Sequence, residues 1–239
     1  MENNNWNITQ DASSQSASSA KTFMASVFSW MFVALTITTI AAYYFASDMS
    51  LMSTLANEKG MTILGYVVMF APLGFVLMMG VGFNKFSYSV LLTLFLAFAA
   101  IMGISLSFVL LIYTASSVYT TFASTAVMFG VMAALGYTTS TDLTKLGNIL
   151  MMALVGMIVA SLINMFMHSG TMSYIISFIG VIVFTGLTAY DVQKLKRIGE
   201  GAEYGAESTK KLVIMGALSL YMDFINLFLS LLRLFGDRK

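Results

Sequence analysis

Two aspartates stand where a membrane protein rarely carries a charge. Asp223 lies inside the apolar run GALSLYMDFINLFLSLLRLFG, and Asp191 closes the preceding apolar run, in TAYDVQKLKR. An aspartate at the centre of a membrane helix costs roughly 2.5–3.5 kcal/mol, so such a residue usually faces a protein interior or a wet cavity and has a partner. Asp191 is the nearest candidate partner for Asp223, because it belongs to the neighbouring run.

Two carboxylates in one poorly hydrated site cannot both ionise cheaply, so the pair is expected to hold a shared proton near neutral pH. A shared proton can join two helices by a hydrogen bond, and its loss favours water or a cation between them. Carboxylate oxygens also suit Ca²⁺. Asp191 and Asp223 are therefore the candidate gating residues and the candidate calcium ligands. Alternatively, Asp191 caps its helix or pairs with Lys194, and Asp223 makes a buried hydrogen bond to a serine or tyrosine.

Helical spacing adds a polar stripe around these acids. On the last run the stripe comprises Gly216, Ser219, Asp223, Asn226, Ser230 and Arg233, and on the preceding run Gly180, Thr188 and Asp191 form a weaker counterpart. Residues three or four apart share one helix face, so the last helix is expected at the centre of a bundle. At about 1.5 Å per residue the two acids differ in depth by roughly 10 Å. They meet if the last helix begins out in the cytoplasm or the preceding helix is shifted, and an aqueous cavity reaching inward would have the same effect.

The composition excludes an ordinary soluble domain. The 239-residue chain is 58% hydrophobic and only 10% charged, with a mean hydropathy of +0.84, whereas soluble domains are about 25% charged. It has no cysteine and one histidine, so thiolate and multi-histidine metal sites are excluded. A net charge of +1 gives no reason to expect nucleic acid. We expect an all-α membrane protein that is no enzyme and has no cofactor.

Seven apolar runs are each long enough to cross a hydrocarbon core about 30 Å thick. They cover Phe23–Phe45, Met61–Phe83, Tyr88–Ile112, Phe122–Tyr137, Ile149–Met167, Met172–Tyr190 and Leu212–Leu232. We expect a turn over Tyr113–Thr120, a charged loop of about fifteen residues after the sixth run, and close helix contact at the small residues Ala126, Gly130 and Ala134. The predicted domains are a disordered polar tail (1–22), a transmembrane domain (23–235) and a short C-terminal tail (236–239).

The basic residues predict the orientation. On the side that holds the N-terminus lie eight, Lys21, Lys85, Lys145, Lys194, Lys196, Arg197, Lys210 and Lys211, and on the other side four, Lys59, Arg233, Arg238 and Lys239. The positive-inside rule then places the N-terminus in the cytoplasm and the C-terminus across the inner membrane.

Three segments together resemble the Bax inhibitor-1 family: AYDVQKLKR, LYMDFINLFLSLLRLFG and GYTTSTDLTKLGNIL. The resemblance implies seven helices, with the last enclosed by two three-helix layers. It also implies a pH-sensitive Ca²⁺ leak whose paired aspartates fall on Asp191 and Asp223. Some bacterial relatives associate with a membrane-bound ATP-dependent protease, which makes such a partner conceivable beside the bilayer and Ca²⁺. Certain members carry an arginine in span two, whereas this chain has no Lys or Arg between Lys59 and Lys85.

Two rival functions remain open at this point. A non-conducting regulator that binds a membrane protease or another membrane protein fits the same composition. An aspartyl intramembrane protease also pairs a Tyr-Asp on its sixth span with an aspartate on its seventh, and Tyr190–Asp191 fits that first half. The second half of that motif is Gly-x-Gly-Asp, but Leu220, Tyr221 and Met222 precede Asp223 here.

Overall fold

The computed structural model describes residues 3–57, 60–203 and 205–239, with side chains described from Ser18 onward. Its helices are α1 (Asn3–Ser47), α2 (Met49–Leu55), α3 (Ile63–Gly82), α4 (Tyr88–Ile112), α5 (Ala115–Thr138), α6 (Thr144–Met167), α7 (Gly170–Glu200) and α8 (Glu207–Phe235). Two short antiparallel strands, β1 (Ala56–Asn57) and β2 (Gly60–Met61), pair between α2 and α3. All helices but α2 are long and apolar enough to cross a membrane, so the predicted seven spans are confirmed in the described chain.

Two predicted boundaries are wrong. The turn expected over Tyr113–Thr120 is only two residues long, because α5 already begins at Ala115, where the Thr114 hydroxyl accepts the Ser117 N–H. Hydroxyl residues continue this helix by bonding back to the preceding turn, as Thr120 does to the Ser116 carbonyl. The charged loop expected after the sixth run is also shorter, since α7 continues to Glu200 and α8 begins at Glu207.

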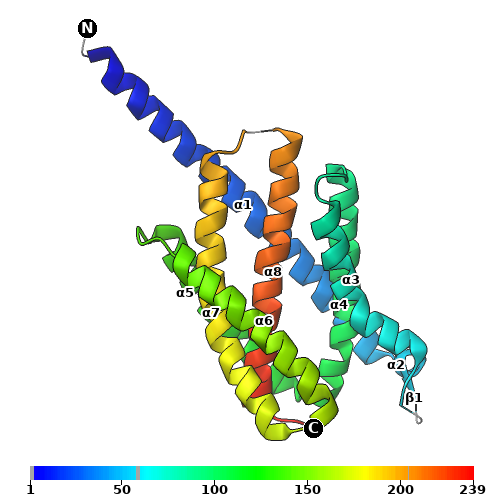
Figure 1. The fold of residues 1–239 in the computed structure, drawn as a ribbon. Coiled ribbons are helices and arrows are strands. Elements are labelled where there is room, and N and C mark those ends of the chain that lie inside the picture. Colours follow the sequence, from blue (N-terminus) through cyan, green and yellow to red (C-terminus); the bar gives the residue numbers. More distant parts are fainter. Residues whose placement is uncertain (1–2, 58–59, 204) are drawn as a thin grey trace.

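Helix α8 occupies the centre of the bundle, as predicted (Figure 1). Of its most apolar stretch 67% is buried, against 6% for α6. It packs against α1, α4, α5 and α7, whereas α3 packs mainly on α4 and α6 packs on α7. The two three-helix layers implied by the family resemblance are not confirmed by this arrangement.

The two termini lie at opposite ends of the bundle, and the N-terminal part of α1 projects beyond it (Figure 1). The membrane-spanning part of α1 begins at Ser18. Residues 1–2 lie outside the described part of the chain, and the disordered tail expected over residues 1–22 stays a prediction. We call the end that carries the start of α1 the N-terminal side, and the opposite end the C-terminal side.

Close helix contacts occur at glycines other than the expected one. A Cβ atom on Gly103 of α4 would collide with the Thr38 carbonyl oxygen and the Ala41 side chain of α1, and one on Gly136 of α5 would collide with the backbone of Ala189 of α7. Gly130 has open space around it instead. The expected contact stripe around Gly130 is therefore wrong, because the stripe faces outward while a neighbouring face of α5 packs inward.

One face of α8 is tied to the bundle by a buried tyrosine. Tyr221 is fully buried, and its hydroxyl hydrogen-bonds to the Thr38 hydroxyl at 2.7 Å. Thr38 donates in turn to the Ala99 carbonyl oxygen of α4 at 2.8 Å. This chain of bonds links α1, α4 and α8, and it fixes which face α8 turns away from them.

Candidate functional site

The structure brings the two aspartates together, as the sequence predicts. Asp191 on α7 and Asp223 on α8 line the same cavity, and their carboxyl groups are close enough to interact electrostatically. Ser219, one turn before Asp223, donates its hydroxyl to Oδ2 of Asp191 at 2.5 Å. Asp223 is only 6% exposed, and its Oδ2 has no hydrogen-bond partner among the described residues. One buried carboxylate oxygen of the pair is thus left unsatisfied.

Helix geometry explains how acids at different depths come close together. Every side chain of an α-helix leans toward the N-terminus of its own helix. Because α7 and α8 are consecutive and antiparallel, Asp191 leans toward the C-terminal side while Asp223 leans toward the N-terminal side. The two carboxyl groups therefore approach each other. Both helices also extend past the predicted spans, α7 to Glu200 and α8 back to Glu207, which gives them a long common interface.

The acid pair lines a cavity of about 740 Å³ between α3, α6, α7 and α8, with Asp191 as the last α7 residue of the lining toward the N-terminal side. One face of α8 lines it along its length, with members three or four residues apart: Met215, Ser219, Met222, Asn226, Leu229 and Arg233. The outer walls are apolar and come from α6, with Met151, Leu154 and Met157 among them, and from Val76 of α3. Figure 1 shows α8 between α3 on one side and the α6–α7 pair on the other. Val76 is the α3 residue that lines the cavity, and span two supplies no cation to the acids.

The two ends of the cavity differ. Toward the C-terminal side the lining ends at the exposed Arg233. Toward the N-terminal side the α7–α8 contact beyond the acids contains the buried side chain of Leu195. Leu195 packs so closely on Gly216 that a Cβ atom there would lie 2.6 Å from its Cδ2 atom. The acid pair thus stands between a cavity and a tightly packed apolar seal.

The segment of α7 that follows Asp191 is clamped to the α5–α6 loop. Gln193, 5% exposed, accepts the Leu143 N–H at 2.9 Å and donates to the Thr141 carbonyl oxygen at 2.7 Å. Lys196 donates to the Tyr137 carbonyl oxygen at 3.0 Å. These bonds fix the rotation and height of α7 next to the acid pair.

An ion pair completes this clamp at its exposed edge. Arg197 lies 3.0 Å from the carboxylate of Asp142, which also accepts the hydroxyl and the N–H of Thr144. The two Thr144 bonds, with a smaller contribution from Arg197, lower the pKa of Asp142 to about 2. Asp142 is therefore ionised at every physiological pH.

The predicted supporting residues take different positions. Ser219 bonds directly to Asp191, and Asn226 and Ser230 line the cavity toward Arg233. Ser230 donates to the Asn226 carbonyl oxygen within its own helix. Thr188 is fully buried, and its hydroxyl donates to the Phe184 carbonyl oxygen of its own helix at 2.7 Å. The functional roles of all these residues stay predictions.

Comparison with known proteins identifies the family. A family model described as "Inhibitor of apoptosis-promoting Bax1" matches residues 20–239. The chain belongs to the Bax inhibitor-1 family. It is 43% identical to the "Inner membrane protein YbhL" of Escherichia coli K12 over 96% of this chain and 97% of that protein. It is also 39% identical to a Borreliella burgdorferi protein, over 91% and 92% of the two chains, and 40% identical to a Rickettsia prowazekii protein, over 91% and 90%.

The three segments that carry the Bax inhibitor-1 resemblance form one contiguous region. The α7 segment AYDVQKLKR contributes Asp191 and the clamp residues Gln193 and Arg197. These clamp residues hold the segment GYTTSTDL between α5 and α6. The α8 segment supplies Asp223. Sequence reasoning missed Gln193. The sequence feature that could have pointed to Gln193 is its uncharged amide, which stands between an apolar run and a run of basic residues.

Proposed function

We propose that the protein is a pH-sensitive Ca²⁺ leak of the inner membrane, with Asp191 and Asp223 as its gate. The observation that carries this proposal is the unsatisfied Oδ2 of Asp223, buried beside a second carboxyl group in the lining of a cavity. A dry carboxyl pair of this kind favours a state with a shared proton. The proton joins α7 to α8 and keeps the apolar seal closed.

Loss of the shared proton opens the gate in this proposal. Two facing carboxylates repel each other and draw in water or a cation, which separates α7 from α8 at the seal formed by Leu195 and Gly216. The cavity then continues to the N-terminal side. Lys194, three residues further along α7, interacts electrostatically with Asp191.

Calcium enters the proposal as the transported ion. The side chains of Asp191, Asp223, Ser219 and Asn226 offer oxygen atoms to a cation in the cavity. Among the described residues, no three acidic, histidine or cysteine side chains gather around one point as a metal site would need. A resident Ca²⁺ takes six to eight oxygen ligands. A site with so few protein ligands suits an ion that keeps part of its water shell and moves on.

The orientation follows from the positive-inside rule. The N-terminal side carries the α3–α4 and α5–α6 loops and the α7–α8 connection, with most of the Lys and Arg residues. We therefore place this side in the cytoplasm, in line with the inner-membrane name of the Escherichia coli relative. The cavity mouth at Arg233 then faces the opposite compartment.

A non-enzymatic role agrees with the residues around Asp223. Leu220 is fully buried, and Met222 forms part of the cavity wall. These bulky side chains stand where an aspartyl intramembrane protease has glycines that admit a peptide.

The proposal is tested by Ca²⁺ flux into liposomes that contain only the purified protein, across a series of pH values. The wild type should conduct, with a flux that rises as the acid pair loses its proton. Asp223→Asn removes the shared acidic proton while keeping the side-chain size, so its flux should no longer respond to pH, and Asp191→Asn should behave alike. Glu203→Gln, at an exposed acid of the α7–α8 connection outside the cavity, serves as the matched control and should respond as the wild type does.

Two results would contradict the proposal. An unchanged pH response in Asp223→Asn would end the gate model. Wild-type liposomes without flux at any pH would favour the second candidate, a non-conducting regulator that needs a membrane protease or another membrane protein to act.

A further inference from the structure

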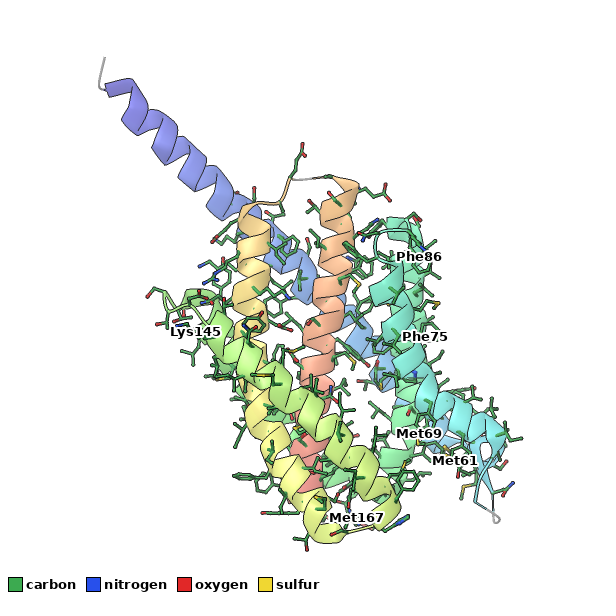
Figure 2. All side chains as sticks on the ribbon, viewed as in Figure 1. Met61, Met69, Phe75, Phe86, Lys145 and Met167 are labelled. Atoms are coloured by element: carbon green, nitrogen blue, oxygen red, sulfur yellow. The ribbon has the colours of Figure 1, made fainter. Side chains whose placement is uncertain are left out.

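A second, smaller pocket lies where the start of α6 meets α7, outside the acid-pair cavity. Its volume is about 300 Å³, and its lining residues are Thr144, Tyr190, Gln193, Lys194, Arg197 and Ile198. We call it the α6–α7 pocket. Figure 2 labels Lys145 at this end of α6, next to α7. The pocket is on the N-terminal side, where basic residues are concentrated.

The charges in this pocket are not balanced by the protein. Arg197 pairs with Asp142 at 3.0 Å and keeps 48% of its side chain exposed. Lys194 is exposed, its amine is 5.9 Å from the Tyr190 ring centroid, and within the described chain no carboxylate lies within 4.0 Å of it. The lining of the pocket thus holds two cations, Lys194 and Arg197, and no carboxylate. An anion from outside the chain would complete the site.

The surroundings of the pocket indicate the source of that anion. Deeper in the membrane, the side of α6 that carries Thr144 exposes apolar side chains, with Met152 68% exposed and Val155 59% exposed. A ligand here meets positive charge at one level and apolar surface two to three turns deeper. A free phosphate ion uses only the first of these features, whereas a phospholipid uses both. Basic pockets between transmembrane helices on the cytoplasmic side bind the headgroups of anionic lipids.

We propose that the α6–α7 pocket binds the phosphate headgroup of an anionic phospholipid, with Lys194 and Arg197 as its cationic contacts and the exposed face of α6 against the acyl chains. Lys194 also interacts electrostatically with Asp191, three residues earlier on α7. A bound headgroup therefore stands next to the segment that carries one member of the acid pair. The binding itself does not depend on whether the protein conducts Ca²⁺.

The test measures lipid binding to the full-length protein in neutral detergent, with phosphatidylglycerol and phosphatidylcholine as probes and native mass spectrometry as the readout. Wild-type protein should bind phosphatidylglycerol more tightly than phosphatidylcholine. Lys194→Gln should weaken phosphatidylglycerol binding about fivefold, which corresponds to about 1 kcal/mol for one basic side chain near an anionic surface. Lys194→Arg keeps the charge and should bind as the wild type does.

Lys210→Gln is the matched control, because it removes one exposed lysine on the same side at the start of α8. It should leave phosphatidylglycerol binding unchanged. Equal weakening in Lys210→Gln and Lys194→Gln would overturn the pocket in favour of a general surface charge effect. Competition by inorganic phosphate at the same concentration as the lipid would overturn the assignment to a phospholipid.

Discussion

The hydrogen bond from Ser219 to Asp191 should set part of the pH at which the gate opens. The Ser219 hydroxyl lies 2.5 Å from Oδ2 of Asp191 and stabilises the charged form of that carboxyl group. A hydrogen bond to a charged acceptor contributes about 1.5–3 kcal/mol, and about 1.4 kcal/mol corresponds to one pH unit. Ser219→Ala should therefore keep the shared proton in place to higher pH, and the midpoint of the flux response should rise by about 1 to 2 pH units.

The assay is Ca²⁺ flux into protein-containing liposomes, fitted for its pH midpoint. Ser230→Ala is the matched control, because the Ser230 hydroxyl lines the same cavity but donates to the Asn226 carbonyl oxygen of its own helix. It should not move the midpoint, and Ser219→Thr, which retains a hydroxyl, should restore it. A midpoint in Ser219→Ala that is unchanged or lower than in the wild type would refute the reasoning.

Two further predictions concern stability. The pKa of Asp142 is lowered to about 2 in the folded protein, so its contacts stabilise the fold above the usual carboxyl pKa of about 4 and are lost as the pH falls toward about 2. The difference in unfolding temperature between wild type and Asp142→Asn should therefore vanish between about pH 4 and pH 2. A difference that stays constant over this range would exclude the clamp as its cause. Gly103→Ala should lower the unfolding temperature, because the added Cβ atom collides with Thr38 and forces α1 away from α4. Overpacking of this kind typically costs about 1–3 kcal/mol. Gly130 has open space around it, so Gly130→Ala should leave the unfolding temperature unchanged, and equal behaviour of the two variants would contradict the packing argument.

Part of the candidate site could be predicted because membrane insertion makes charge informative. Asp223 stands in an apolar run where a carboxylate is costly, so its need for a partner is visible in the sequence alone. Ser219 and Asn226 follow from helical spacing. Gln193 could not be predicted, because its role depends on the backbone of the α5–α6 loop, about fifty residues earlier in the chain.

The cavity walls left no signal in the sequence. Met151 and Leu154 line the cavity, while Met152 and Val155 beside them are exposed on the outside of α6. Both sets are apolar, because lipid and a membrane cavity wall accept the same side chains. For the same reason the expected contact stripe at Gly130 faces outward, although its small residues suit a helix contact.

The sequence alone determined that the chain crosses the membrane seven times with its last helix at the centre, because span length and the cost of buried charge are local properties. Only the tertiary structure decided that the carboxyl groups of Asp191 and Asp223 come close enough to interact. Their approach depends on the antiparallel lean of two side chains and on the lengths of α7 and α8 beyond the apolar runs. It also depends on the tie from Tyr221 to Thr38, which turns one face of α8 into the bundle and leaves the acid face toward the cavity.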